Sequence, residues 1–179
     1  MKAPVFLLAL ATALPATADT GELEHFGEKG AELLQPFQQQ LQSALQEGMQ
    51  ESVVEAIRVC QLEAPEIVER VTPEGVMMGR TSHRVRNPDN APLEWQEEIL
   101  THYLDNPGNF EPMQKRIDDT RVAHAQPIRT ESLCLSCHGT DLEQDVQAKL
   151  DELYPDDEAT GFAAGDFRGI FWVTMPDDS

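Results

Sequence analysis

Two cysteines and a histidine form the part of the sequence best suited to do chemistry. Cys134 and Cys137 are separated by two residues, and His138 follows the second cysteine directly. Thiols at this spacing on a helical turn can each form a thioether with one vinyl group of haem, and the adjacent imidazole is then placed to bind the iron. The pattern therefore predicts one covalently attached haem of the c type, with His138 as an axial ligand.

The same cysteine pair fits two other kinds of site less well. A structural zinc site usually takes its four ligands from two paired knuckles, whereas this sequence offers one CxxC pair and the distant Cys60. A thioredoxin-like redox pair belongs in a βαβ context, which the surrounding sequence does not provide. We therefore favour haem over zinc or dithiol chemistry.

Residues 1–18 have the composition of a secretory signal peptide. A lysine precedes an apolar run over residues 5–14, and residues 16–18 form a small-x-small cleavage pattern. The apolar run is too short for a membrane span, and no other stretch could cross a bilayer. We expect a signal peptide over 1–18, a single haem-binding domain over 19–179 and a periplasmic location, which is the kind of compartment where c-type haem is attached.

The composition is strongly acidic. The 179 residues include 32 Asp and Glu against 13 Lys and Arg, which gives a formal net charge of −19. Such a surface argues against nucleic acid or anionic lipid as a partner and favours solubility or a basic partner. No acid–base constellation around a substrate pocket can be named, so we do not expect an enzyme.

The first part of the chain has the periodicity of a long amphipathic helix. From about residue 28, apolar residues recur every three or four positions. Pro36 and Gly48 are candidate breaks, and the helix should stop or bend at Pro65, because the residue before proline disfavours the helical region. Cys60 lies on the apolar stripe near this expected end, so it is either a buried structural thiol or the second axial ligand.

Later segments carry a mixture of strand and helix signals. Strands are expected at 76–85, 121–128 and 166–174, helices at 93–104 and 141–153, and a loop or short helix around Lys115 and Arg116. Because the strands do not follow a regular βαβ alternation, we expect an α+β fold with an antiparallel sheet.

Three arginines are concentrated in one short segment, at Arg80, Arg84 and Arg86. On so acidic a chain this concentration favours a local anion. Haem propionates are candidates, because arginine makes charge-assisted and often bidentate hydrogen bonds to carboxylates. Pairing with neighbouring Asp and Glu is the alternative for each arginine.

The second iron ligand has several candidates in the sequence. His or Met is the usual partner in an electron-carrying cytochrome. His83 and His124 lie in predicted strands, where either could face the haem. His102 on a predicted helix is expected to be exposed or capping, His25 is expected to be a bystander, and the methionines are more typical of core positions. The pattern leaves Cys60, His83 and His124 open.

Several separated motifs give the chain a family resemblance. They include Ala56-Ile57-Arg58-Val59-Cys60, Arg80-Thr81-Ser82, Arg86-Asn87-Pro88-Asp89-Asn90, Cys134-Leu135-Ser136-Cys137-His138-Gly139, Tyr154-Pro155-Asp156 and Gly165-Asp166-Phe167-Arg168-Gly169. With these motifs in order, the chain resembles the secreted c-type haem proteins with a PAS-like fold, which occur as stand-alone periplasmic proteins and as sensor domains of receptors.

The resemblance implies a PAS-like antiparallel sheet with flanking helices and a long N-terminal helix. It also implies axial ligation by His138 and by a cysteine at the position of Cys60. The family often has an apolar residue where this chain has His83, which keeps a His/His pair as an alternative.

Two functions are compatible with these expectations. In the first, the protein is a redox or small-molecule sensor or regulator: reduction loosens Cys60 and opens a site for a diatomic gas such as CO or NO, and a signalling receptor receives the signal. In the second, it is a periplasmic electron-transfer cytochrome c whose acidic surface steers docking to a basic redox partner protein.

Overall fold

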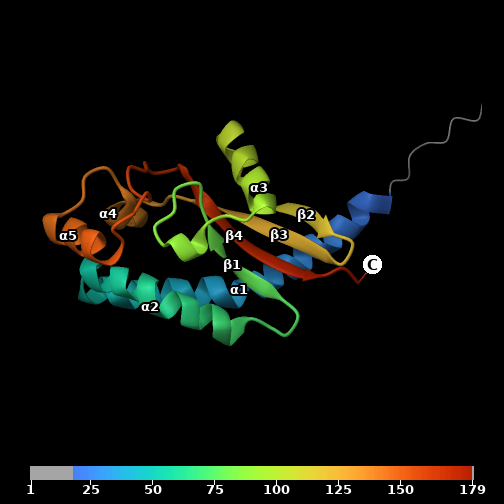
Figure 1. The fold of residues 1–179 in the computed structure, drawn as a ribbon, viewed down its shortest axis with the longest axis horizontal. Coiled ribbons are helices and arrows are strands. Elements are labelled where there is room, and N and C mark those ends of the chain that lie inside the picture. The colour runs from blue at the N-terminus through green and yellow to red at the C-terminus, as the bar shows by residue number, and fades with distance from the viewer. Residues whose placement is uncertain (1–17, 179) are drawn as a thin grey trace, which may run out of the picture.

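Four antiparallel strands form the central sheet of the computed structural model, which describes residues 18–178 (Figure 1). The strands are β1 (Met77–Thr81), β2 (Met113–Asp118), β3 (Arg121–Arg129) and β4 (Phe167–Pro176), in the order β1-β4-β3-β2. The last strand of the chain therefore lies inside the sheet, between β1 and β3. The α+β fold with an antiparallel sheet expected from the sequence is confirmed, and it is consistent with a PAS-like arrangement.

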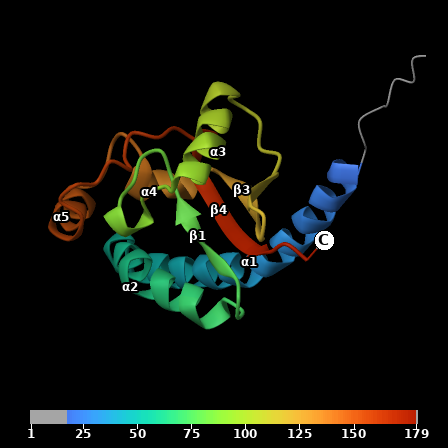
Figure 2. The ribbon, with the colours of Figure 1, turned by 45° about the vertical axis from the view of Figure 1, so that its right-hand side comes forward.

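The predicted long helix is two helices, α1 (Ala18–Glu51) and α2 (Val53–Val71), which pack side by side and run in opposite directions (Figures 1 and 2). The chain turns at Ser52, whose hydroxyl caps α2 by accepting a hydrogen bond from the Glu55 amide at 3.0 Å. The breaks expected at Pro36, Gly48 and Pro65 are wrong. Both prolines lie inside helices, because packing of the apolar stripe outweighs their local preference.

Gly48 has a different role from the one expected. A Cβ at this position would lie 3.0 Å from the Cα of Ala56 and 3.0 Å from a methyl group of Val59. The missing side chain therefore lets the end of α1 approach the start of α2 closely. The resulting hairpin places Cys60 in the middle of α2 rather than near the end of a single long helix.

The two faces of the sheet are covered by different helices. The pair α1 and α2 lies against one face, and α3 (Glu94–Asp105) lies on the other (Figure 2). Alternate residues of β4 follow this division: Val173 and Met175 pack with α1, whereas Ile170 packs with Tyr103 of α3. Two separate apolar clusters hold the helices to the sheet.

A second helical region lies at the end of the molecule where α1 joins α2. A short 3-10 helix (Ser132–Cys134) leads directly into α4 (Leu135–His138), and α5 (Gln144–Leu153) follows. Apolar side chains of α5 pack on Ile57 of α2, with Tyr154 and partly buried Cys137 in the same cluster. The CxxCH turn is thus held against the helix that carries Cys60.

Two expected elements differ from the sequence prediction. β1 ends at Thr81, so residues 82–86 leave the sheet, with the Ser82 hydroxyl donating to the Arg168 carbonyl at 2.5 Å. Lys115 and Arg116 lie in β2 and not in a loop or short helix. β2 is a partly exposed edge strand, so it lacks the apolar alternation that reveals a strand in sequence.

Among the described residues, no helix has both the length and the apolar character needed to cross a bilayer. Nearly all of the predicted signal peptide, residues 1–17, lies outside the described part of the chain. The signal peptide and the domain boundary at residue 19 therefore stay predictions.

A pair of glycines in α1 tests the packing of this helix on the sheet. A Cβ at Gly30 would lie 2.3 Å from the Cβ of His124 on β3, whereas a Cβ at Gly27 would meet only the flexible amide end of Gln114. We expect Gly30→Ala to lower the free energy of unfolding by about 1–3 kcal/mol, the usual cost of overpacking.

The matched Gly27→Ala should be neutral or should raise the free energy of unfolding by up to about 1 kcal/mol, because alanine has the higher helix propensity. Urea unfolding followed by circular dichroism measures both variants. Equal effects of the two substitutions would contradict the close approach of α1 to β3.

Candidate functional site

The three cysteines are free thiols, each partly buried. Burial raises the pKa of the Cys137 thiol to about 11, Arg86 opposes this increase, and the neighbouring Cys60 and Cys134 add to it. The thiols are therefore close enough to influence each other's charge, although Cys60 comes from α2 and the other two from the CxxCH turn. The structure brings together the cysteines that the sequence singled out.

The turn that carries the motif is sharply defined by Gly139. The Gly139 amide donates to the Leu135 carbonyl at 3.0 Å and ends α4. A Cβ at this position would lie 2.6 Å from the same carbonyl oxygen, so any larger residue would disturb the turn. Glycine here fixes the place where the chain leaves the helix directly after His138.

The imidazole of His138 is oriented by a backbone carbonyl. Its Nδ1 lies 2.6 Å from the Ala159 oxygen, a contact in which Nδ1–H donates. Nε2 is then the nitrogen with a free lone pair, as in most histidines that ligate a metal. Burial lowers the pKa of His138 to about 2, and the nearby Arg168 and Arg86 oppose its protonation further. The ring is neutral at any physiological pH and ready to bind a metal ion.

The backbone of residues 159–162 forms hydrogen bonds with the end of the CxxCH motif. Besides the Ala159 carbonyl, the Phe162 amide donates to the His138 carbonyl at 2.9 Å, and the Gly161 amide donates to the Gly139 carbonyl at 2.9 Å. The Phe162 ring meets the imidazole edge-on at 6.4 Å. We call residues 159–162 the brace, since its contacts fix both the position and the tautomer of His138.

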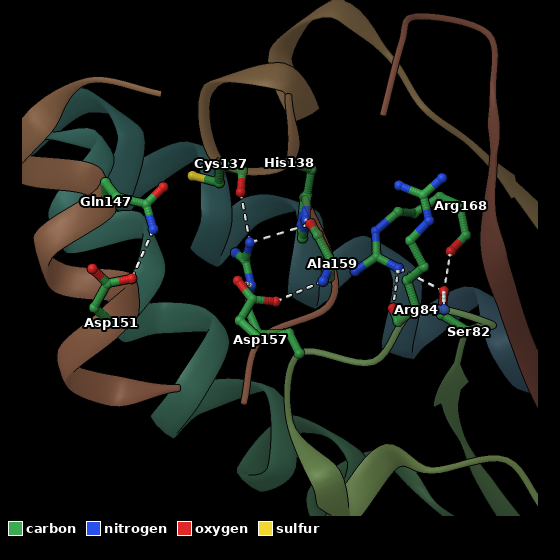
Figure 3. Close-up of polar contacts among 10 residues, drawn as sticks. Ser82, Arg84, Cys137, His138, Gln147, Asp151, Asp157, Ala159 and Arg168 are labelled. Atoms are coloured by element: carbon green, nitrogen blue, oxygen red, sulfur yellow. Dashed lines mark hydrogen bonds and ion pairs between the residues drawn. The ribbon is translucent and has the colours of Figure 1, made fainter. Parts of the chain in front are cut away.

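Arg86 links the motif to the brace, through contacts with Cys137 and Asp157, which Figure 3 labels beside Ala159. Its Nη2 donates to the Cys137 carbonyl at 2.6 Å, and its Nε donates to Asp157 Oδ2 at 2.9 Å. The other Asp157 oxygen accepts from the Ala159 amide at 2.7 Å. Both side chains of the ion pair are nearly buried, with 11% and 9% of their surface exposed. Of the two roles expected for Arg86, the structure shows pairing with a carboxylate; binding a propionate stays a prediction.

Arg84 and Arg168 form a basic cluster beside the motif. Arg84 donates to the Thr160 carbonyl at 2.7 Å and lies 4.5 Å from the centre of the Phe162 ring. Arg168, on β4, donates from Nη1 to the Ser82 hydroxyl at 2.8 Å. Burial lowers the pKa of Arg168 to about 9, and the neighbouring Arg80 and Arg86 contribute in the same direction.

Sequence reasoning missed Arg168 as a functional candidate. It is the one charged residue between Phe167 and Pro176, in a strand of mostly aromatic, β-branched and other apolar residues. A single charged residue in such an apolar strand indicates a functional role, because removing an unpaired guanidinium from water is costly. Phe162 was missed for lack of any local signal.

A cavity of about 420 Å³ lies between α2 and the edge strand β1. Cys60 lines it from α2, Arg80 from β1 and Gln96 from α3. Its size falls in the usual range for small-molecule sites, about 300–1,000 Å³. Cys60 and Arg80, both singled out by the sequence, thus line the same cavity from two different elements.

The two alternative histidine ligands lie in different parts of the fold. His124 is buried on the α1 face of the sheet, with its Nδ1 3.1 Å from the Gln114 amide and its Cβ against Gly30. His83 stacks on Phe167 and meets the Phe162 ring edge-on, each at 5.8 Å. Phe162 also contacts His138, so both imidazoles flank the same phenylalanine.

The zinc arrangement considered from the sequence is not formed. Within residues 18–178, no group of three or more His, Cys, Asp or Glu side chains is arranged to hold a metal ion. What the structure offers is one neutral imidazole with a free nitrogen, two thiols on the adjacent turn and a third thiol from a neighbouring helix. This set defines an α+β domain with a CxxCH site.

Comparison with known proteins places this domain in a family. The family model described as "Tll0287-like: Tll0287" matches residues 23–176, and the chain belongs to the Tll0287-like family. Among solved structures, the crystal structure of the cyanobacterial heme-protein Tll0287 matches with a TM-score of 0.66 and 23% identity, covering 86% of this chain and 96% of that one. At this identity the likeness shows the fold. No curated protein matches the chain.

The Arg86–Asp157 pair tests how the motif is held. Replacing one member of a buried ion pair leaves an uncompensated charge, so we expect Asp157→Asn to lower the free energy of unfolding by about 3–5 kcal/mol in urea titrations. The exposed pair of Lys149 and Glu152 is the matched control, and Glu152→Gln should cost about 1 kcal/mol or less. A similar small cost for both variants would show that the pair does not anchor the CxxCH turn.

Proposed function

We propose that the chain is a c-type haem protein, with one haem attached covalently through Cys134 and Cys137 and with His138 and Cys60 as axial ligands. The observation that carries the proposal is the hydrogen bond from His138 Nδ1 to the Ala159 carbonyl, which leaves Nε2 free on the turn that carries the two thiols. The relative described as a cyanobacterial heme-protein supports haem as the group that such a family member holds.

The donor set fits this group. Thioether formation consumes two thiols on one turn, and the neutral imidazole supplies a nitrogen ligand. When bound, the iron supplies one-electron chemistry and a position for a small ligand. Cys60 supplies a soft sulfur donor from a separate helix, so it can approach from a direction that the CxxCH turn does not occupy.

Cys60 is favoured over the two histidines by position. His83 contacts the Phe162 and Phe167 rings and does not line the cavity that Cys60 borders. His124 is packed against Gly30 of α1, on the face of the sheet that this helix covers. Cys60 lies close enough to Cys137 to affect its pKa, and it borders a cavity.

A redox or small-molecule sensing and regulatory role is the function that this ligand set supports best. A thiolate stabilises ferric iron more than ferrous iron, so reduction would weaken the bond from Cys60. A cavity of about 420 Å³ borders Cys60, so the sulfur could withdraw from a bound iron, and the vacated position could then take a diatomic gas. We propose that the protein acts in the periplasm and that a signalling receptor there detects the change in ligation at Cys60.

Electron transfer is the second candidate, and the charge of the chain favours it. With a net charge of −19, the protein would be attracted electrostatically to a basic redox partner during diffusion. In this role Cys60 would stay bound in both oxidation states. Neither candidate requires an enzymatic activity, a nucleic acid or a membrane span.

The ligand assignment is tested by Cys60→Ser in the exported, full-length protein. We expect the wild type to gain the mass of one haem and to show the low-spin ferric EPR signal of thiolate ligation. The variant should keep the covalent haem and lose that signal, and the control His83→Ala should retain it. An unchanged spectrum in Cys60→Ser would contradict the assignment, and a wild type without covalent haem would contradict the whole proposal.

Sensing and electron transfer are separated by ligand binding to the reduced protein. For sensing, we expect CO to bind the ferrous wild type after release of Cys60, and to bind Cys60→Ser faster, since no sulfur must leave first. Stopped-flow absorption after mixing with CO measures both rates. Absence of CO binding in the wild type, together with fast electron exchange, would contradict the sensor and support the carrier.

A further inference from the structure

We infer that the guanidinium of Arg168 is the anchor and counter-ion for a carboxylate that the cofactor carries, namely a haem propionate. This inference rests on the proposed function and assigns a role to a residue outside the CxxCH turn and outside α2. Its basis is a partly buried positive charge whose hydrogen bonds go to neutral oxygens.

The contacts of Arg168 leave its charge uncompensated. Nη1 donates to two neutral oxygens, the Ser82 hydroxyl at 2.8 Å and the Arg84 carbonyl at 3.3 Å. Among residues 18–178, no carboxylate forms an ion pair with this guanidinium. Burial lowers its pKa to about 9, which shows the electrostatic cost of keeping the charge there. Hydrogen bonds to neutral groups orient a guanidinium but do not cancel its charge.

The surrounding charges make the imbalance larger. Arg80 and Arg86 both oppose the protonation of Arg168, and Arg84 lies in the same cluster on the Phe162 ring. The charge of Asp157 favours protonated Arg168, but both Asp157 oxygens are already engaged, one by Arg86 and one by the Ala159 amide. The local balance calls for an additional anion.

The other arginines are less suited to bind that anion. Arg86 is committed to Asp157 and to the Cys137 carbonyl, and Arg84 is committed to the Thr160 carbonyl. Arg80 lines the cavity at Cys60 and is the remaining candidate for a second carboxylate. Arg168 therefore has a fixed orientation and an unpaired charge. Arg86 is paired with Asp157, and Arg84, which also donates to a neutral carbonyl, adds to the unpaired positive charge of the cluster.

Arg168 also lies at the right place. Its charge acts directly on His138, and the Cys134 thiol acts on Arg168, so the guanidinium is within electrostatic reach of both ends of the CxxCH turn. Figure 3 shows Arg168, Arg84 and Ser82 together beside the contact of His138 with Ala159. The Ser82 hydroxyl, which donates to the Arg168 backbone and accepts from its Nη1, locks the side chain in this position.

The experiment uses full-length holoprotein with Arg168→Gln and Arg168→Lys. Glutamine can still donate to Ser82 but has no charge, and lysine keeps the charge but lacks the planar fork that fits a carboxylate. Arg129→Gln is the matched control, because this arginine is exposed and lies over Phe110. Spectroelectrochemical titration gives the reduction potential, and resonance Raman spectroscopy gives the propionate bending band.

We expect the propionate band to shift in both Arg168 variants and not in the control. The reduction potential should fall in Arg168→Gln, since the unneutralised propionate stabilises ferric iron, and should stay near the wild-type value in Arg168→Lys. If Arg168→Gln does not accumulate, the band shift in Arg168→Lys decides the question.

Three outcomes would overturn the inference. An unchanged propionate band in both variants would mean that Arg168 has only a structural role. A lower potential with an unchanged band would mean that its charge acts at a distance and not as an anchor. Either result, with covalent haem present, leaves the proposed function standing. Absence of covalent haem from the wild type would contradict both the inference about Arg168 and the proposed function.

Discussion

The structure of the site depends on one hydrogen bond, from His138 Nδ1 to the Ala159 carbonyl at 2.6 Å. It selects the tautomer with a free Nε2 and fixes the ring at the end of a helical turn. The acceptor is itself positioned, because Asp157 binds the Ala159 amide and Arg86 joins Asp157 to the Cys137 carbonyl. The ion pair, the backbone brace and the imidazole form one closed set of contacts around the motif.

The rest of the fold brings the remaining donors to this set. The turn at Ser52 reverses the chain, so α2 returns along α1 and presents Cys60 toward the end of the molecule that holds α4. β4 crosses the middle of the sheet and carries Arg168 to the same region. The proposed ligands and the basic cluster come from segments far apart in sequence, which would give a bound iron two unlike donors on separate elements.

Sequence reasoning succeeded where a local pattern has a local cause. The alternation of β3 and β4 and the periodicity of α3 are such patterns, and they predicted those elements closely. It failed where tertiary contacts decide: Gly48 marks a close helix contact and not a break, Pro65 is tolerated inside α2, and the exposed edge strand β2 has no apolar alternation. The hydrogen-bond partner of His138 could not be predicted, because every residue has a backbone carbonyl and the sequence does not indicate which one the imidazole meets.

The central claim is that the iron lies between His138 and Cys60. A crystal structure of the exported holoprotein, with anomalous diffraction measured at the iron absorption edge, tests it most directly. The account predicts a single anomalous peak, bonded on one side to Nε2 of His138 and on the other to Sγ of Cys60. A peak bonded to His83 or His124 in place of Cys60, or no iron beside the CxxCH turn, would contradict it.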